Sequence, residues 1–247
     1  MSRQIQGSWE PMSQPFRRGR HYVSKIWEGV RITLLEDRLE LISPAHLRTL
    51  SNAIHTGGLA EANVIVNWKV PLDYAGTDPA LDTSLQLSRW GYSPVHTIGL
   101  LTAAKLTHAS VAELEGDCFK LLCITTAGTR NAARAGLPRT TFSAYSAGTI
   151  NTILLLDGQM TDSAMTNAII TYAEAKAAAL ADLQLMDPET NRIATGTTTD
   201  AVVIGVSGNP AYKALHAYAG AATTIGNAIG RLVYETVQEA CRTQHES

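Results

Sequence analysis

The sequence predicts an α+β fold in one domain, with a mixed or largely antiparallel sheet packed against long helices. Strand-like runs dominate the first half of the 247 residues, and the long helical patterns come late. That order favours segregated helices over strict β-α-β alternation. No linker-like stretch divides the chain into halves, and 45% hydrophobic with 17% charged residues is typical of a globular domain. A three-layer α/β fold is the alternative.

The first twenty residues differ from the rest in composition. They are polar and contain two prolines and three arginines between Pro11 and Arg20. Such a segment buries little apolar surface, so we expect a flexible lead-in over residues 1–20 and a single domain over 21–247.

Strand signals begin with a hairpin. In residues 29–43, GVRITLLEDRLELIS, two strand-like runs flank the turn Glu36-Asp37-Arg38. Further apolar or β-branched runs predict strands near 63–70, 95–103, 118–128, 149–156 and 201–208.

Three segments have helical patterns. Residues 78–91 are predicted to start at Asp78 as N-cap with Pro79 in the first position. Residues 162–185 are rich in Ala, Leu, Glu and Lys behind a Thr161 N-cap. Residues 218–238 repeat apolar side chains at helical spacing.

Composition also excludes several classes of function. A net charge of −2 gives no basic footprint, so we expect neither nucleic-acid nor membrane binding. The three cysteines form no C-x-x-C pair and the histidines have no metal spacing, so we predict no metal site. Without a signal-peptide pattern or about 18 uninterrupted apolar residues, a cytoplasmic location is expected.

Three loops combine glycine with hydroxyl and amide side chains: residues 125–136, 146–151 and 194–202. Each is also compatible with an ordinary turn at a strand end. The first loop follows its strand, whereas the other two precede theirs. If all three line one site, the first strand must run antiparallel to the other two.

A lysine interrupts the apolar face of the 162–185 helix. About 100° per residue places Lys176 among apolar side chains and Glu174 on the opposite side. Three interpretations remain open for Lys176: a stem that extends to water, a buried ion pair with an acid such as Asp200, or a pocket base or oxyanion stabiliser.

From about residue 40 onward, the chain contains an ordered series of short motifs. The series is Ser51-Asn52-Ala53 with Gly57-Gly58-Leu59, Asn67, Leu101-Thr102-Ala103-Ala104, Thr126-Ala127-Gly128 with Asn131-Ala132, Gly148-Thr149-Ile150-Asn151, Glu174-Ala175-Lys176, and Ala194-Thr195-Gly196-Thr197 with Thr199-Asp200. In this series the chain resembles the adenosylcobinamide amidohydrolase family, CbiZ.

The resemblance implies hydrolysis of adenosylcobinamide to adenosylcobyric acid and 1-amino-2-propanol in cobamide salvage. The cobalt corrinoid is then the substrate, no separate cofactor is expected, and a homo-oligomer is compatible with the sequence. Two alternatives stay open: a non-catalytic corrinoid-binding protein, and an amidase for another corrinoid or amide.

Amide hydrolysis needs a nucleophile, a base and donors for the oxyanion. Either Glu174 or Asp200 is a candidate base, with Lys176 as its partner or as an oxyanion stabiliser. The nucleophile is water, Thr197 or Thr199. Candidate substrate-binding residues are Gly57, Gly58, Thr126, Gly128, Asn131, Thr149, Asn151, Thr195 and Gly196.

Overall fold

The computed structural model describes residues 14–139 and 148–246. Its main sheet has the strand order β1-β2-β3-β14-β9-β7-β6, and β4 and β5 extend it from the free edge of β3. These nine strands are β1 His21–Val23, β2 Arg31–Leu34, β3 Arg38–Ser51, β4 Gly58–Lys69, β5 Thr97–Thr102, β6 Ser110–Gly116, β7 Phe119–Ala127, β9 Ile150–Asp157 and β14 Ala201–Val206.

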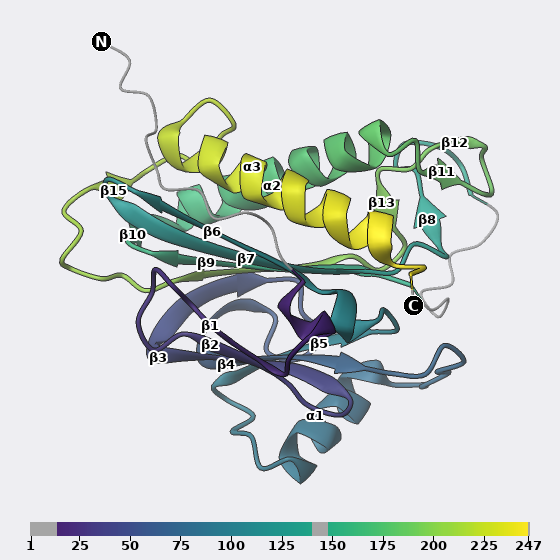
Figure 1. Cartoon of the computed structure of the whole chain (residues 1–247), viewed down its shortest axis with the longest axis horizontal. Helices are drawn as coiled ribbons and strands as arrows, with labels where there is room; N and C mark the ends of the chain where they lie inside the picture. The colour runs from purple at the N-terminus through teal and green to yellow at the C-terminus, as the bar shows by residue number, and fades with distance from the viewer. Residues whose placement is uncertain (1–13, 140–147, 247) are drawn as a thin grey trace.

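Most neighbouring strands are antiparallel, but β14 with β9 and β4 with β5 are parallel. The long strand β3 pairs with β2 in its first half and with β14 in its second, and its register to β4 shifts between Ile42 and Leu47. A bulge of this kind bends a strand. The sheet therefore curls into two facing layers (Figure 1), which confirms the predicted mixed, largely antiparallel α+β domain.

The helices cover the outside of these layers. In Figure 1, α2 (Asp162–Asp182) and α3 (Thr224–Thr243) lie over β6, β7 and β9, whereas α1 (Pro79–Arg89) lies on the far side beneath β4 and β5. Short two-residue strands complete the structure: β8 Ala132–Ala133, β10 Gln159–Met160, β11 Met186–Asp187, β12 Arg192–Ile193, β13 Gly196–Thr197 and β15 Leu215–His216. Two 3-10 turns occur at Pro15–Arg17 and Leu106–His108.

Alternation along the shared strands creates two cores. On β7, Leu121 and Cys123 face the helices, whereas Leu122 and Ile124 face the other layer of the sheet. Successive side chains of a strand point to opposite faces, so burying both faces requires a nearly continuous apolar run. The sequence of β7 has that composition, and so does β9, INTILLLD, in which every residue is buried.

Helix starts agree with the sequence. The Asp78 carboxylate accepts from Leu81 N, and the Thr161 hydroxyl accepts from Ala164 N, as N-caps do. The last helix differs, because it begins at Thr224 and ends at Thr243 rather than spanning 218–238. Thr223 caps it by accepting from Gly226 N, and this places the preceding residues in a loop.

The first part of the predicted lead-in, residues 1–13, lies outside the described residues. The remainder, 14–20, contacts the domain: Phe16 is buried, and the Gln14 amide donates to His108 O and to Thr243 Oγ1. Residues 14–20 are therefore packed on the domain rather than loosely attached, and the domain boundary stays a prediction.

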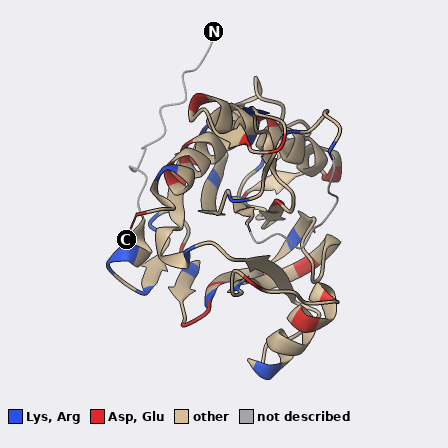
Figure 2. Ribbon diagram, turned by 90° about the vertical axis from the view of Figure 1, so that its right-hand side faces the viewer, with Lys and Arg blue, Asp and Glu red and all other residues tan. Residues whose placement is uncertain are grey.

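Charges are distributed without a single-sign face in the view of Figure 2, where blue and red segments are interspersed. Within residues 14–139 and 148–246, no helix has both the length and the apolarity needed to cross a bilayer.

Candidate active site

Three polar loops meet at one edge of the sheet. Strand β7 runs antiparallel to β9, and β9 runs parallel to β14. The end of β7 and the beginnings of β9 and β14 therefore share an edge, as the loop polarity predicted. Two residues of the predicted second loop, Ser146 and Ala147, lie outside the described residues.

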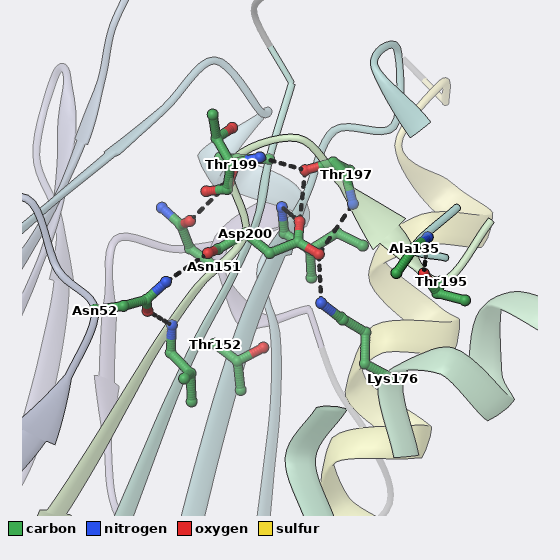
Figure 3. A network of polar contacts seen from close by, with 12 residues as sticks. Asn52, Ala135, Asn151, Thr152, Lys176, Thr195, Thr197, Thr199 and Asp200 are labelled. Atoms are coloured by element: carbon green, nitrogen blue, oxygen red, sulfur yellow. Dashed lines mark hydrogen bonds and ion pairs between the residues drawn. The ribbon is translucent and has the colours of Figure 1, made fainter. Parts of the chain in front are cut away.

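The Asp200 carboxylate is the centre of this edge (Figure 3). One oxygen, Oδ1, accepts from Ile150 N at 3.0 Å and from Thr197 Oγ1 at 2.5 Å. The other, Oδ2, accepts from Thr197 N at 3.0 Å and from the Lys176 ammonium. Bonds from a cation and two backbone N–H groups fix the orientation of the carboxylate.

Lys176 reaches Asp200 from α2. Both side chains are only 10% exposed, so the second interpretation of Lys176, a buried ion pair, is the one that the structure adopts. Gly196 makes the pair possible, because a Cβ at that position would stand 2.9 Å from Lys176 Nζ and still closer to the Asp200 carboxylate. The Tyr172 ring lies 5.2 Å from the ammonium and adds a cation–π contact.

Three threonine hydroxyls at this edge have different acceptors. Thr197 donates to Asp200, whereas Thr199 donates to Gly148 O at 3.0 Å. Thr149 donates to Thr199 O at 2.8 Å, which ties the start of β9 to the loop before β14. Of the two candidate nucleophiles, only Thr197 donates its hydroxyl to a group that can accept a proton.

A chain of buried amides lies beneath the loops. The Asn151 amide donates to Asn67 Oδ1 at 2.9 Å and to Leu101 O at 2.8 Å, and the Asn67 amide donates to Thr126 Oγ1 at 2.9 Å. Asn67, Asn151 and Thr126 are all buried. Asn151 therefore joins the two layers of the sheet, and both N–H donors of its amide are already used within the protein.

The remaining predicted binding residues divide into near and far groups. Gly128 N donates to Thr149 O, and the Asn131 amide donates to Thr198 Oγ1, so both support the edge. Thr195 accepts from Ala135 N and lies apart from the carboxylate in Figure 3. Gly57 and Gly58 form the turn into β4, where Gly58 has a φ of 81° and so takes a left-handed conformation that favours glycine.

Glu174 is not brought into this cluster. It is exposed on α2, two residues before Lys176, whose side chain is buried. The helical period separates the two faces, as the sequence predicted, and of the two candidate bases only Asp200 lies at the loop edge.

A cleft opens beside the cluster, with a volume of about 360 Å³. One wall is polar and comes from the loops before β9 and β14, including Thr149, Thr199 and Asp200. The other wall is mostly apolar, and its residues are Ile54, Val70, Tyr74, Pro79, Leu100 and Leu101. A cleft with one apolar and one hydrogen-bonding wall suits an amphipathic organic ligand.

Most lining residues were not among the predicted site residues, and three of them carry polar side-chain groups beside the cluster or across the cleft from it: Asn52, Tyr74 and Thr198. Asn52 brackets the start of β14, since its amide donates to Asp200 O and accepts from Val202 N. Its place in the Ser51-Asn52-Ala53 motif was a usable signal. Tyr74 belongs to the segment before α1, which no motif connected to the site.

Thiol chemistry has little support in this structure. Burial raises the pKa of Cys123 to about 12, and burial followed by the nearby Asp200 charge raises the pKa of Cys241 to about 12. Both thiols therefore stay protonated at neutral pH and are poor nucleophiles. Within the described part of the chain, no group of three or more His, Cys, Asp or Glu residues could hold a metal ion.

Comparisons with known proteins identify the family of the chain. The model of the family described as adenosylcobinamide amidohydrolase (CbiZ) matches residues 27–247. An adenosylcobinamide amidohydrolase of Methanosarcina mazei is 29% identical over 196 residues, which span 77% of this chain and 88% of that protein. The uncharacterized protein MJ1613 of Methanocaldococcus jannaschii is 34% identical over 159 residues, 57% of this chain and 61% of that protein.

Two solved structures share little sequence with the chain. The PH0078 protein of Pyrococcus horikoshii aligns with a TM-score of 0.42 at 10% identity, covering 90% of this chain and 81% of that one. A β-aminopeptidase of Burkholderia aligns with a TM-score of 0.39 at 12% identity, covering 84% and 78%.

Proposed function

Because the chain belongs to the adenosylcobinamide amidohydrolase family, we propose that it hydrolyses the amide between a corrin propionate and aminopropanol. The products are adenosylcobyric acid and 1-amino-2-propanol. The observation that carries the proposal is the Asp200 carboxylate at the edge of the cleft, held by Lys176 and bonded to the Thr197 hydroxyl. A base beside a hydroxyl is the arrangement that acyl-transfer chemistry requires.

The size of the cleft supports entry of one limb of the substrate. A volume of about 360 Å³ lies at the lower end of the range for small-molecule sites. A corrin macrocycle is much larger than such a ligand, so we propose that the aminopropanol arm enters and that the ring stays at the mouth.

In the proposed reaction, Asp200 takes the proton of the attacking oxygen. That oxygen adds to the amide carbon, the C–N bond breaks, and the proton passes to the leaving amine. Lys176 keeps the carboxylate oriented. Two nucleophiles fit this scheme: the Thr197 hydroxyl, which forms an ester that water then cleaves, and a water molecule that attacks directly.

The test is incubation of the purified protein with adenosylcobinamide, with and without EDTA, followed by mass spectrometry of the corrinoid. We expect adenosylcobyric acid in both samples. Glu174→Gln provides the comparison between the two candidate bases, and we expect it to keep at least half of the wild-type rate. Unchanged substrate that co-elutes with the protein would instead support a corrinoid-binding protein. The absence of both turnover and binding would refute the corrinoid assignment.

A further inference from the structure

Thr198 differs from its two neighbours in how its hydroxyl is used. The Thr197 hydroxyl donates to Asp200, and the Thr199 hydroxyl donates to Gly148 O, so both hydrogens point into the protein. The Thr198 oxygen instead accepts from the Asn131 amide at 2.6 Å. Within the described residues, its own hydrogen has no acceptor.

The position of Thr198 allows that hydrogen to bond a ligand in the cleft. The residue is exposed and lines the cleft next to Thr199 and Asp200. A hydroxyl oxygen that accepts one strong hydrogen bond keeps its O–H group for a different direction. Asn131 is 9% exposed, so the donor that sets this orientation is itself held in place.

We propose that Thr198 is a specificity-determining residue whose hydroxyl donates a hydrogen bond to a carbonyl oxygen of the bound substrate. The inference rests on the proposed function, and it adds an acceptor-recognising contact on the polar wall. Its place on the exposed side of the loop assigns it to an amide carbonyl beside the scissile bond, rather than to the oxygen on which charge develops. The contact is then equally strong in ground and transition states, so its loss raises KM and leaves kcat unchanged.

Thr198→Val removes the hydroxyl and keeps the shape of the side chain. One lost hydrogen bond is worth about 1 kcal/mol, so KM for adenosylcobinamide should rise about 5-fold while kcat stays within about 2-fold. Thr198→Ser should restore the wild-type KM. The matched control is Thr166→Val, which changes an exposed threonine on α2 that does not line the cleft, and should change neither constant.

Asn131→Asp tests the orientation of the hydroxyl. A carboxylate at position 131 accepts the Thr198 hydrogen, and this withdraws it from the substrate. We expect a rise in KM like that of Thr198→Val, and no further rise when the two changes are combined, because both remove the same bond.

The outcomes separate the inference from the proposed function. Turnover by the wild type with an unchanged KM in Thr198→Val overturns the inference alone, and so does a kcat loss that Thr198→Ser fails to restore. If the wild type binds adenosylcobinamide without turning it over, the proposed function fails and the Kd of each variant decides the role of Thr198 in the same way. Absence of both binding and turnover overturns both.

Discussion

The two ends of strands β9 and β14 each hold an aspartate bonded to a hydroxyl, but they are built differently. At one end, Asp200 accepts from Thr197, from backbone N–H groups and from the Lys176 ammonium, beside an open cleft. At the other end, Asp157 accepts from Ser207 Oγ at 2.8 Å and from the Asn209 amide at 3.0 Å, and it is not among the residues that line the cleft.

The difference between the two clusters indicates which features serve catalysis rather than stability. Ser207 also accepts from Gly158 N and Asn209 N, so the Asp157 cluster shapes the turn after β9. Neutral hydrogen-bond donors are enough for that purpose. The Asp200 cluster adds a buried cation. Removing a cation from water costs desolvation energy, so a buried ion pair contributes little net stability. We interpret the lysine and the cleft together as the mark of a reactive carboxylate.

The largest expected effect comes from removing the cation. Lys176→Met leaves the buried Asp200 carboxylate without its counter-charge, which should cost about 3–5 kcal/mol of stability and at least ~100-fold in kcat/KM. Urea denaturation and initial rates measure the two losses. Arg231→Met, which breaks an exposed pair with Glu235, is the control and should cost less than about 1 kcal/mol. A Lys176→Met protein as stable as that control would contradict the buried-pair account.

Removing the hydroxyl that faces Asp200 should affect the rate more than stability. Thr197→Ala is expected to lower kcat by about 10²–10⁴-fold, the usual contribution of a proton-transfer partner. Thr199→Ala, whose hydroxyl bonds only a carbonyl, should lose much less. Rates with adenosylcobinamide give the ratio, and a larger loss in Thr199→Ala would exchange the two roles.

The structural end of the strands should respond in stability alone. Ser207→Ala withdraws a donor from Asp157, which is 6% exposed, and should cost about 1–3 kcal/mol. Turnover should stay at the wild-type level, because Ser207 and Asp157 lie at the ends of β9 and β14 that are opposite to the cleft. Denaturation and rate measurements on the same variant test whether the Asp157 cluster serves stability alone. A loss of activity at unchanged stability would contradict that assignment.

A smaller effect should appear at alkaline pH near the Asp200 end. Burial, and then the Asp200 charge, raise the pKa of Cys241 from 9.0 to about 12. The unfolded thiol ionises first, so the stability that this group contributes is intact below pH 9 and is lost as the pH rises toward 12. At pH 10 the loss is about 1 kcal/mol. Cys241→Ala should therefore flatten the alkaline arm of the stability curve, and an unchanged arm would exclude this thiol as its cause.

Much of the fold and part of the site could be predicted from the sequence, because local rules govern them. The caps at Asp78 and Thr161 set two helix starts, and the polarity of three loops required β7 to oppose β9 and β14 if the loops share one site. The pairing of Lys176 with Asp200 was one of three open interpretations, since periodicity locates a side chain on a face but not its partner. The cleft wall at Tyr74 and the bond from Asn131 to Thr198 depend on long-range packing, for which no local pattern exists.

The most direct test of the central claim compares the two aspartates in the same assay. Asp200→Asn and Asp157→Asn make the same chemical change at opposite ends of β9 and β14, and turnover of adenosylcobinamide in EDTA is followed by mass spectrometry. We expect Asp157→Asn to form adenosylcobyric acid at close to the wild-type rate, and Asp200→Asn to form at least ~100-fold less. Equal losses in the two folded variants, or full activity in Asp200→Asn, would contradict the assignment of Asp200 as the reactive carboxylate.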